Sequence, residues 1–406
     1  MTCKRTAQRP PEMIRVTIDS LAFGGDGVGR DEEGRVVFVP NTAPGDRLVA
    51  EVLETKKGFV RARLKKNLRP GPRVEPPCPH FDAGCGGCQW QHVPLDVQRA
   101  AKEDIVRRAL RHVVPAEAIR PIAVPSPALG WRRRARLHFR RGKLGYLARR
   151  SHDLIDIRDL CPQLASPLEA ALRAIRPISL PGSGDLELLL TRRGEVHLSV
   201  DGPAARVADL APLLGQAGIV GISARGESLG AAEVDLGDGA AAFWTSADAF
   251  VQVSDPGNDL LRALVTEAAG PTAGARVLEL HAGSGNFTRD FAGAEIVAVE
   301  ESPAAAARLA RNASAHVQIR RAEAWDGAGP FDVILVDPPR TGLDPGLAER
   351  LAALRAPRFV YVSCDPPTLA RDLAPLVGAG YRPLWAQPVD LMPQTFHVEV
   401  VTALAV

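Results

Sequence analysis

This 406-residue sequence has few cysteines, no long apolar runs and no apolar segment among its first ten residues. Six cysteines are too few for a disulfide framework in a chain of this length. No run approaches the roughly 18 consecutive apolar residues that a membrane-spanning helix requires, which excludes a membrane protein of that kind. The first ten residues are basic and polar, so we expect no secretory signal and a cytoplasmic location.

Net charge is also small, at +3, but its distribution along the chain is uneven. Residues 1–150 contain 7 Lys and 23 Arg against 15 acidic residues, a balance of +15, which leaves −12 for residues 151–406. Such asymmetry predicts a polyanionic partner bound by the front of the chain, with nucleic acid first among the candidates. A solvated basic face is the alternative.

The length predicts two or three domains, and the first is expected at residues 1–70. Residues 12–69 alternate apolar and polar side chains between glycine turns, which predicts five short strands and a small OB-like barrel. Cationic side chains gather toward its end: Lys56, Lys57, Arg61, Arg63, Lys65, Lys66 and Arg69. This pattern favours nucleic-acid binding, although a charged strand edge that resists aggregation would look the same.

Residues 71–240 are expected to form a central α+β domain. The segment 131–150 alternates apolar residues with a dense Arg array, which predicts a strand with one basic face. Trp131, Phe139 and Tyr146 lie among these arginines, and aromatic side chains between cations suit stacking on unpaired bases.

A cysteine cluster opens this central region. The motif CPHFDAGCGGCQWQH contains Cys78, Cys85 and Cys88 within eleven residues. Soft sulfur ligands at such spacing suit zinc or an iron–sulfur cluster, and a fourth ligand must come from elsewhere. Cys161 is the natural choice, whereas His80 or His92 would favour zinc. Three buried, inert cysteines are the remaining interpretation.

Residues 241–406 change to alternating strand and helix patterns, which predict a parallel sheet covered by helices. The segment 276–292 is expected to be a strand, a glycine-rich turn and a helix. The turn is neither GxGxxG nor a P-loop, which makes dinucleotide or nucleoside-triphosphate binding less favoured. Glu300 ends the next strand, where a carboxylate accepts hydrogen bonds from a ribose diol. This combination fits S-adenosylmethionine about as well as NAD.

Two later strands end in side chains that carry chemistry. Asp337 is followed by Pro338 and Pro339, which stiffen the loop and fix the carboxylate. Cys364 stands alone at the tip of a buried strand, where a nucleophile is well placed. The N-terminus of the helix expected after it would stabilise the thiolate. Glu399 lies in an apolar strand, and burial would raise its pKa and make it a usable base. We expect His397 to face the other side and to be structural.

Taken together, six ordered motifs resemble the RNA (uracil-5-)-methyltransferase family of the TrmA/RumA type. They are QVSDPGN, LELHAGSGNFT, VAVE, VDPPR, YVSCDP and FHVEVV. The closest likeness is to its 23S rRNA branch, which carries an iron–sulfur cluster and a TRAM domain. The resemblance implies an N-terminal OB-like TRAM barrel, a central α+β iron–sulfur domain and a C-terminal Rossmann-like class I methyltransferase at residues 241–406.

The same resemblance implies roles for particular residues. Cys364 would add to carbon-6 of uracil, and Glu399 would remove the carbon-5 proton after methyl transfer. The implied contacts of S-adenosylmethionine are Gln252, His281, Asn286, Glu300, Glu323 and Asp337. Cys78, Cys85, Cys88 and Cys161 would hold a 4Fe–4S cluster. His281, Ala282 and Ser254 depart from the usual motif residues, and the gap from Cys78 to Cys85 is one residue longer than expected.

The implied partner is RNA, ribosomal RNA more than transfer RNA, with no membrane and a monomeric enzyme. Three other functions remain open on the sequence. A methyltransferase acting on an amine would have no need of Cys364. A metal-bearing RNA-binding protein would have an inert methyltransferase domain. A radical methyltransferase would use clustered cysteines, but its usual cysteine spacing is missing.

Overall fold

A computed structural model describes residues 12–157, 160–237, 239, 241–327 and 329–406, and these form two compact units. The first unit holds the described residues up to Pro77, with Cys88–Ala101 and Gln394–Phe396. The second holds Cys78–Gly87, Lys102–Pro393 and His397–Val406. None of the described helices is long and apolar enough to cross a membrane.

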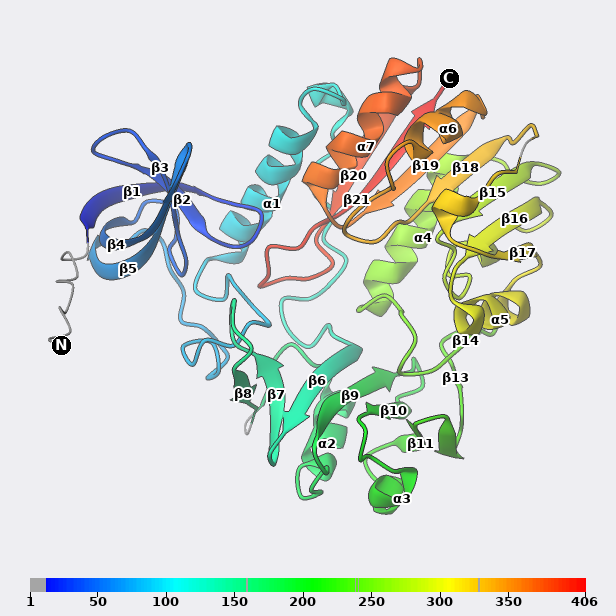
Figure 1. The fold of residues 1–406 in the computed structure, drawn as a ribbon, viewed down its shortest axis with the longest axis horizontal. Helices are drawn as coiled ribbons and strands as arrows, with labels where there is room; N and C mark the ends of the chain where they lie inside the picture. Colours follow the sequence, from blue (N-terminus) through cyan, green and yellow to red (C-terminus); the bar gives the residue numbers. More distant parts are fainter. Residues whose placement is uncertain (1–11, 158–159, 238, 240, 328) are drawn as a thin grey trace, which may run out of the picture. The chain divides into compact units, whose positions relative to one another are not determined.

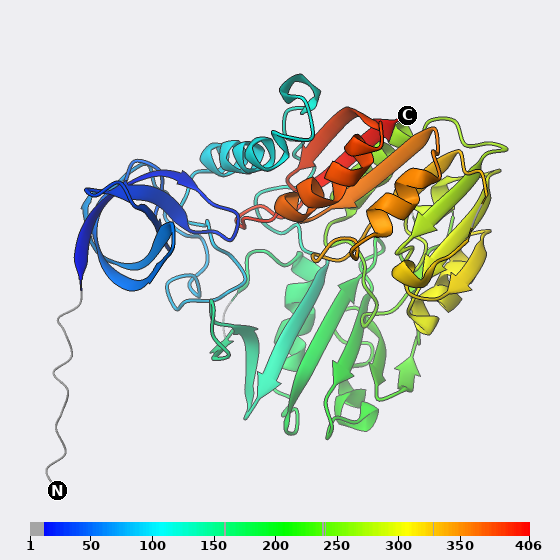
Figure 2. The same ribbon diagram turned by 45° about the horizontal axis from the view of Figure 1, so that its top comes forward.

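The first unit contains a closed five-stranded barrel in the order β1-β2-β3-β5-β4 (Figures 1 and 2). The strands are β1 Met13–Leu21, β2 Gly27–Asp31, β3 Val36–Val39, β4 Arg47–Lys56 and β5 Phe59–Arg69. Alternate apolar residues such as Val16, Ile18 and Leu48 fill its core, as the period-two pattern predicted. The expected small barrel is therefore confirmed.

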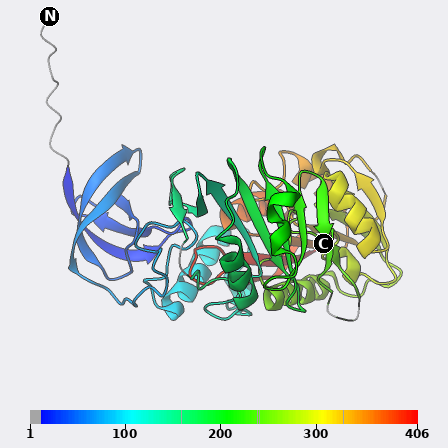
Figure 3. The ribbon, with the colours of Figure 1, turned by 90° about the horizontal axis from the view of Figure 1, so that it is seen from below.

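Next along the chain, helix α1 Leu95–Leu110 precedes a seven-stranded sheet in the order β12-β11-β10-β9-β6-β7-β8. Its elements are η1 Ala116–Ala118, β6 Arg134–Arg140, β7 Lys143–Leu147, β8 Leu154–Asp156, α2 Ser166–Ile175, β9 Ser183–Leu190, β10 Val196–Asp201, α3 Val207–Leu210, η2 Ala211–Leu213, β11 Ile219–Ala224 and β12 Glu227–Gly230. Helix α2 lies on one face of this central sheet, over a continuous apolar core (Figures 1 and 3).

The central sheet corrects one sequence-based expectation. Phe139 on β6 is only 3% exposed and Trp131 only 6%, so neither ring is available for stacking on a base. Phe139 belongs to the core beneath α2, because strand alternation sends it to the face opposite the arginines. Tyr146 is half-buried, with the Arg132 guanidinium above its ring.

The chain then forms a small sheet of β13 Val234–Asp235 and β14 Trp244–Thr245, followed by a second seven-stranded sheet. Its order is β17-β16-β15-β18-β19-β21-β20. The elements are α4 Asp255–Ala269, β15 Arg276–Leu280, η3 Thr288–Asp290, β16 Glu295–Glu300, α5 Pro303–Asn312, β17 His316–Ile319, η4 Ala322–Ala324, β18 Val333–Val336, α6 Leu347–Ala353, β19 Arg358–Ser363, α7 Pro366–Gly378, β20 Arg382–Val389 and β21 Glu399–Ala405.

Both faces of this second sheet are covered, which explains why its strands are apolar without alternation. Leu278, Ile334 and Tyr361 face a core that includes α6 and α7, whereas Val333 and Val360 face a core that includes α4. Strands β15 to β19 pair in parallel, as predicted.

Two details of the expected sheet were wrong. Strand β21 runs antiparallel to both of its neighbours, so the sheet is mixed. The glycine-rich turn after β15 leads into the short 3-10 helix η3, Thr288–Asp290, rather than into an α-helix. Gly283 and Gly285 both have positive φ, which an α-helix does not allow. The residues expected to form the first helical turn therefore form a turn instead.

Candidate active site

Cys364 lies at the carboxyl end of β19, between a buried strand and helix α7. Its neighbour Asp365 is the N-cap of α7 and accepts a hydrogen bond from the backbone N–H of Thr368. Ser363 and Asp365 are further joined, because Asp365 N–H donates to the Ser363 hydroxyl at 3.1 Å. The half-buried thiol therefore sits on a fixed turn.

Glu399 begins β21 and comes beside Cys364 through strand register. The antiparallel pairing of β19 and β21 runs from Arg358 opposite Ala405 to Ser363 opposite Val400. Cys364 and Glu399 are the next residues beyond this last pair, and they lie near enough for Glu399 to act electrostatically on the thiol; Glu399 is only 7% exposed. Two residues 35 positions apart in sequence thus meet at one edge of the sheet, as the sequence-based mechanism requires.

The electrostatics of the pair favour the protonated forms. Burial raises the pKa of Glu399 to about 8, with Asp337 adding to the rise and Arg340 opposing it. Burial also raises the pKa of the Cys364 thiol to about 12, helped by Glu399 and again opposed by Arg340. The expected thiolate stabilisation by the α7 N-terminus does not prevail, because desolvation and three neighbouring carboxylates outweigh it.

His397 requires a second correction. The expectation that it faces away from Glu399 rests on strand alternation, but His397 lies before the strand, where that rule does not apply. The strand itself starts only at Glu399. Burial, together with the charges of Arg340, Lys102 and Arg132, lowers the pKa of His397 to about 3, so the imidazole is neutral and shares Arg340 with the reacting pair.

Two further carboxyl groups lie at the ends of β18 and β15. Burial raises the pKa of Asp337 to about 7. Burial raises that of Glu279 to about 8, although its carboxylate accepts a hydrogen bond from the Thr288 hydroxyl at 2.7 Å. With Glu399 they make a group of buried carboxyl groups at the carboxyl ends of the strands, and a cation bound there would favour their ionised forms.

The glycine-rich turn is held by Glu300. Its two carboxylate oxygens accept hydrogen bonds from the backbone N–H groups of Gly283 and Ser302, each at 2.8 Å. His281 adopts φ 59°, unusual for a residue with a side chain, and its buried Nε2 has no hydrogen-bond partner among the described residues. An orphaned buried ring nitrogen beside a pocket is available to a ligand.

Asn286, another expected cofactor contact, is held by a residue that the motif analysis did not single out. Its amide exchanges two hydrogen bonds with the amide of Asn258 on α4, at 3.0 and 2.8 Å. Asn258 is only 3% exposed. The pairing fixes the orientation of Asn286 and leaves each amide one free donor and one free acceptor position.

A cavity of about 200 Å³ opens beside these strand ends. Two of the predicted cofactor residues, His281 and Glu323, line it. The loop after β18 contributes Thr341, Gly342 and Asp344 to the same lining. Glu323 forms an ion pair with Arg321. Gln252, Asn286, Glu300 and Asp337 are not among the residues that line this cavity.

Gln252 precedes α4 and is positioned by Arg133. The Arg133 Nε–H donates to the Gln252 carbonyl at 2.9 Å, and its guanidinium also pairs with Asp255. Arg133 is buried, with 4% of its surface exposed. The segment that carries Gln252 is thereby fastened to the central sheet.

The cysteine cluster is only partly assembled by the second unit. Cys78, Cys85 and Cys161 are buried there. Burial is the largest cause that raises the pKa of Cys85 and of Cys161, with a further rise from Cys78 in both and from Cys85 in the second. Cys88 is buried in the first unit. Within the described residues, no three His, Cys, Asp or Glu side chains are arranged to hold a metal ion. The three thiols fit a thiophilic metal by chemistry rather than by a preformed geometry.

Sequence reasoning missed four supporting residues: Arg340, Glu279, Asn258 and Arg133. Arg340 stands inside the DPPR motif and Asn258 inside SDPGN, so both were available as motif members without a role. Glu279, an acid within an apolar strand, carried the same signal that marked Glu399. Arg133 is one of many arginines in its segment, and nothing in the sequence distinguishes the buried one.

Two family models match the chain. Residues 10–65 match the model described as TRAM domain, and residues 232–405 match the model described as tRNA (Uracil-5-)-methyltransferase. The first of these falls on the five-stranded barrel, and the second covers the sheet that carries Cys364 and Glu399.

Similar proteins extend over nearly the whole chain. A 23S rRNA (uracil(1939)-C(5))-methyltransferase RlmD of Pectobacterium atrosepticum is 34% identical, covering 96% of this chain and 93% of its own. The protein of the same name from Pseudomonas entomophila is 35% identical over 95% and 92%. The crystal structure of Pyrococcus abyssi tRNA (uracil-54, C5)-methyltransferase with S-adenosyl-L-homocysteine aligns with a TM-score of 0.76 and 25% identity, over 96% and 99% of the two chains.

Proposed function

This chain belongs to the RNA (uracil-5-)-methyltransferase family, and from that premise we propose that it methylates one uridine of 23S ribosomal RNA through a covalent Cys364 adduct. The coarser activity, transfer of a methyl group from S-adenosylmethionine to carbon-5 of uracil in RNA, follows from the family. The RNA target, the adduct and the residue roles are the proposal.

One observation carries the adduct. The β19–β21 register brings Cys364 beside Glu399, while Arg340 and Asp337 act electrostatically on both. A nucleophile and a base on one face of a bound pyrimidine are what carbon-5 methylation needs. Transfer to an amine would require neither the thiol nor its placement.

In the proposed reaction the Cys364 sulfur bonds to carbon-6 of uracil after loss of its proton. The electron pair of the 5,6 double bond then makes carbon-5 nucleophilic. Bound S-adenosylmethionine would supply an electrophilic methyl group to that carbon, and S-adenosylhomocysteine would leave with the electron pair of the broken sulfur–carbon bond. Because the thiol pKa is near 12, its ionisation must accompany substrate binding, and Arg340 is the cation that lowers the cost.

Glu399 completes the reaction as the base. After methylation, carbon-5 carries both a hydrogen and a methyl group, and Glu399 removes that proton while the carbon–sulfur bond breaks. The double bond re-forms and the Cys364 thiol is released. The raised pKa of Glu399, about 8, makes its carboxylate a stronger base than an exposed glutamate.

The remaining cofactor residues surround the strand ends. We assign Gln252, His281, Asn286, Glu300, Glu323 and Asp337 to binding and orienting S-adenosylmethionine. The orphaned His281 nitrogen and the Glu323 side chain line the cavity beside β15 and β18, which supports this placement. The target uridine must leave its stack to reach Cys364, so a single-stranded or extruded base is the substrate.

A 4Fe–4S cluster on Cys78, Cys85, Cys88 and Cys161 belongs to the same proposal. The gathering of Cys78, Cys85 and Cys161 in one buried neighbourhood supports it. Anaerobically purified protein should contain about four iron atoms per chain and absorb visible light. Cys85→Ser should lose the iron, whereas Cys364→Ser should retain it. Colourless protein with bound zinc would contradict the cluster.

The proposed domains are an RNA-binding barrel at 1–70, a cluster domain at 71–240 and a methyltransferase domain at 241–406. In the structure Cys88–Ala101 belong to the same compact unit as the barrel, and the boundary at 240 lies within the other unit, so both proposed boundaries divide the chain by function. The ribosomal target is favoured over transfer RNA because relatives with 23S rRNA names are 34% and 35% identical, whereas the tRNA (uracil-54, C5)-methyltransferase is 25% identical.

The target is tested with methyl-labelled cofactor and two RNAs, a 23S rRNA fragment spanning the equivalent of uridine 1939 and unmodified transfer RNA. The proposal expects label in one uridine of the ribosomal fragment and none in transfer RNA. Cys364→Ala is the matched control that lacks the nucleophile. Cys161→Ser removes a proposed cluster ligand and keeps the reacting pair, so it shows whether methylation depends on the cluster. Label in transfer RNA alone would overturn the ribosomal assignment and leave the mechanism standing.

A further inference from the structure

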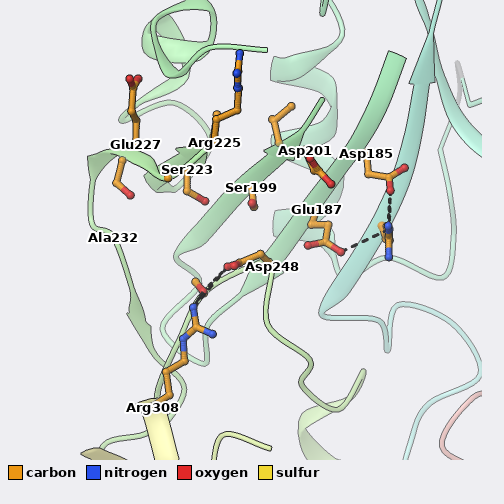
Figure 4. A pocket seen from close by; sticks show the side chains of 16 residues that line it. Asp185, Glu187, Ser199, Asp201, Ser223, Arg225, Glu227, Ala232, Asp248 and Arg308 are labelled. Atoms are coloured by element: carbon orange, nitrogen blue, oxygen red, sulfur yellow. Dashed lines mark hydrogen bonds and ion pairs between the residues drawn. The ribbon is translucent and has the colours of Figure 1, made fainter. Parts of the chain in front are cut away.

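A row of polar side chains crosses the face of the central sheet that α2 leaves uncovered. Strand register places Arg136 opposite Glu187, Glu187 opposite Ser199, Ser199 opposite Ser223, and Ser223 opposite Ser228. Register partners share a face, so five neighbouring strands present one continuous polar line. All five residues line a cavity of about 490 Å³, whose interior Figure 4 shows.

Carboxylates outnumber cations around this cavity. The acids that line it are Asp185, Glu187, Asp201, Glu227 and Asp248, and the cations are Arg136, Arg225 and Arg308. Arg136 already pairs with Asp185 and Glu187, and Arg308 with Glu233. Asp201 and Glu227 are exposed and form no ion pair with any described residue. Their oxygens are therefore available as hydrogen-bond acceptors.

Ser199 provides a second and independent sign of a ligand. It lies in the middle of the polar row and only 9% of its surface is exposed. It borders the cavity between Glu187 and Ser223, and its hydroxyl makes no hydrogen bond to a described residue. The hydroxyl is therefore left to whatever fills the cavity, water or a bound molecule with polar atoms.

The lining selects for a particular chemistry. An apolar ligand would leave these groups unsatisfied, and a bare phosphate would be repelled by the carboxylates. A guanine base presents two adjacent N–H donors, N1–H and N2–H, that one carboxylate accepts together. Uracil has a single N–H between two carbonyls and suits a carboxylate poorly. A cavity of this size holds one nucleotide, and the lining cation that forms no ion pair with a described residue, Arg225, is the one left for its phosphate.

The cavity also lies close along the chain to the cofactor-side motif. Ser246 and Asp248 line it, and Gln252 follows only four residues after Asp248. Between them Phe250 is 70% exposed. We propose that this cavity, centred on Ser199, binds an unpaired guanine of the RNA substrate near the target uridine. The inference rests on the proposed function and adds to it a site that selects the RNA.

The test measures RNA binding rather than methylation. In the 23S rRNA fragment each unpaired guanosine is replaced in turn by inosine, which lacks the N2 amino group. One replacement should weaken binding to the full chain about tenfold in a fluorescence anisotropy titration. The Asp201→Asn, Glu227→Gln double variant should bind the unmodified fragment about tenfold more weakly and lose its sensitivity to that inosine. Ser199→Ala should act in the same direction.

Glu117→Gln is the matched control, because Glu117 is an exposed acid outside the cavity. Removing negative charge strengthens RNA binding non-specifically, so weaker binding by the double variant is diagnostic. Equal binding of every inosine fragment, or an inosine effect that survives in the double variant, would overturn the cavity. If the cavity binds spermidine or Mg²⁺, these variants abolish that binding and no inosine replacement matters, the proposed guanine site would be overturned equally. Adduct formation with 5-fluorouridine RNA is scored separately, so the cavity can fail while the proposed reaction stands.

Discussion

At the scale of single residues, the reacting pair was predictable and its electrostatic environment was not. Cys364 and Glu399 stood out because a lone thiol at a strand tip and an acid within an apolar strand are both costly placements. The sequence could not show that Arg340 is the cation nearest both groups, since that depends on how the loop after β18 folds back. The expectation of a stabilised thiolate failed for the same reason.

The raised pKa of Glu399 predicts a pH dependence. Its folded pKa, about 8, lies above the ordinary value of 4.5, so at pH 6 the group is protonated and cannot accept the carbon-5 proton. We expect the rate of adduct breakdown, measured as methylated RNA released from the protein in a single turnover, to increase as pH rises through 8. Arg340→Gln should move that increase upward by about one pH unit, because the cation that favours the carboxylate is lost.

The control for this profile is Arg382→Gln, which removes an exposed arginine on β20. It should leave the profile where the unaltered chain has it. A profile that is flat between pH 6 and 9, or one that Arg340→Gln does not move, would contradict the role given to Glu399.

At the scale of elements, the periodicity of the sequence predicted the barrel and the alternating strands and helices, but not the direction of β21. An apolar strand reads the same in both directions, and only the pairing with β19 and β20 shows that it is antiparallel. That reversal is what brings Glu399 to Cys364. The missing helix after β15 was likewise invisible, because turn residues with positive φ occupy its first turn.

The loop that follows Asp337 is fastened to α7 at Gly342. This glycine has φ +74°, and a Cβ there would lie 2.2 Å from Thr368 Cγ2 and 2.3 Å from Asp372 Oδ2. Asp372 also accepts hydrogen bonds from Leu343 N–H and the Tyr361 hydroxyl, at 2.7 and 2.6 Å. Gly342→Ala should therefore lower the free energy of unfolding by about 3 kcal/mol, measured by urea denaturation.

Gly378, the last residue of α7, offers a matched substitution. No atom lies within 4 Å of the position that its Cβ would take. Gly378→Ala should leave stability unchanged or raise it by about 0.5 kcal/mol. Equal stability of the two variants would show that the loop does not depend on the close approach at Gly342.

At the scale of the whole molecule, the charge asymmetry predicted a polyanionic partner, with nucleic acid first among the candidates. The structure divides the basic residues of the barrel into two groups. Arg63 and Lys65 each pair with Glu51 at 2.7 Å. Lys66 and Arg69 are exposed and form no ion pair with any described residue. A count of charges along the sequence could not separate them, since cross-strand pairing decides which cations remain available.

This division predicts the salt dependence of RNA binding. Replacing Lys66 and Arg69 by Ala should weaken binding to ribosomal RNA and reduce the slope of log affinity against log salt by about 1.5. Replacing Arg63 and Lys65 should change the slope less, because Glu51 already neutralises part of their charge. Fluorescence titrations at several salt concentrations measure both. Equal slopes for the two double variants would contradict the division.

The most direct measurement concerns the bond between sulfur and the pyrimidine. With 5-fluorouridine in the target RNA, carbon-5 bears fluorine instead of the proton that Glu399 removes, so the adduct cannot break down. Intact-mass analysis after incubation with S-adenosylmethionine should show protein, RNA and one methyl group joined together, and Cys364→Ala should show none. Unaltered chain that methylates uridine yet never gives this adduct, or an adduct that persists in Cys364→Ala, would contradict the account.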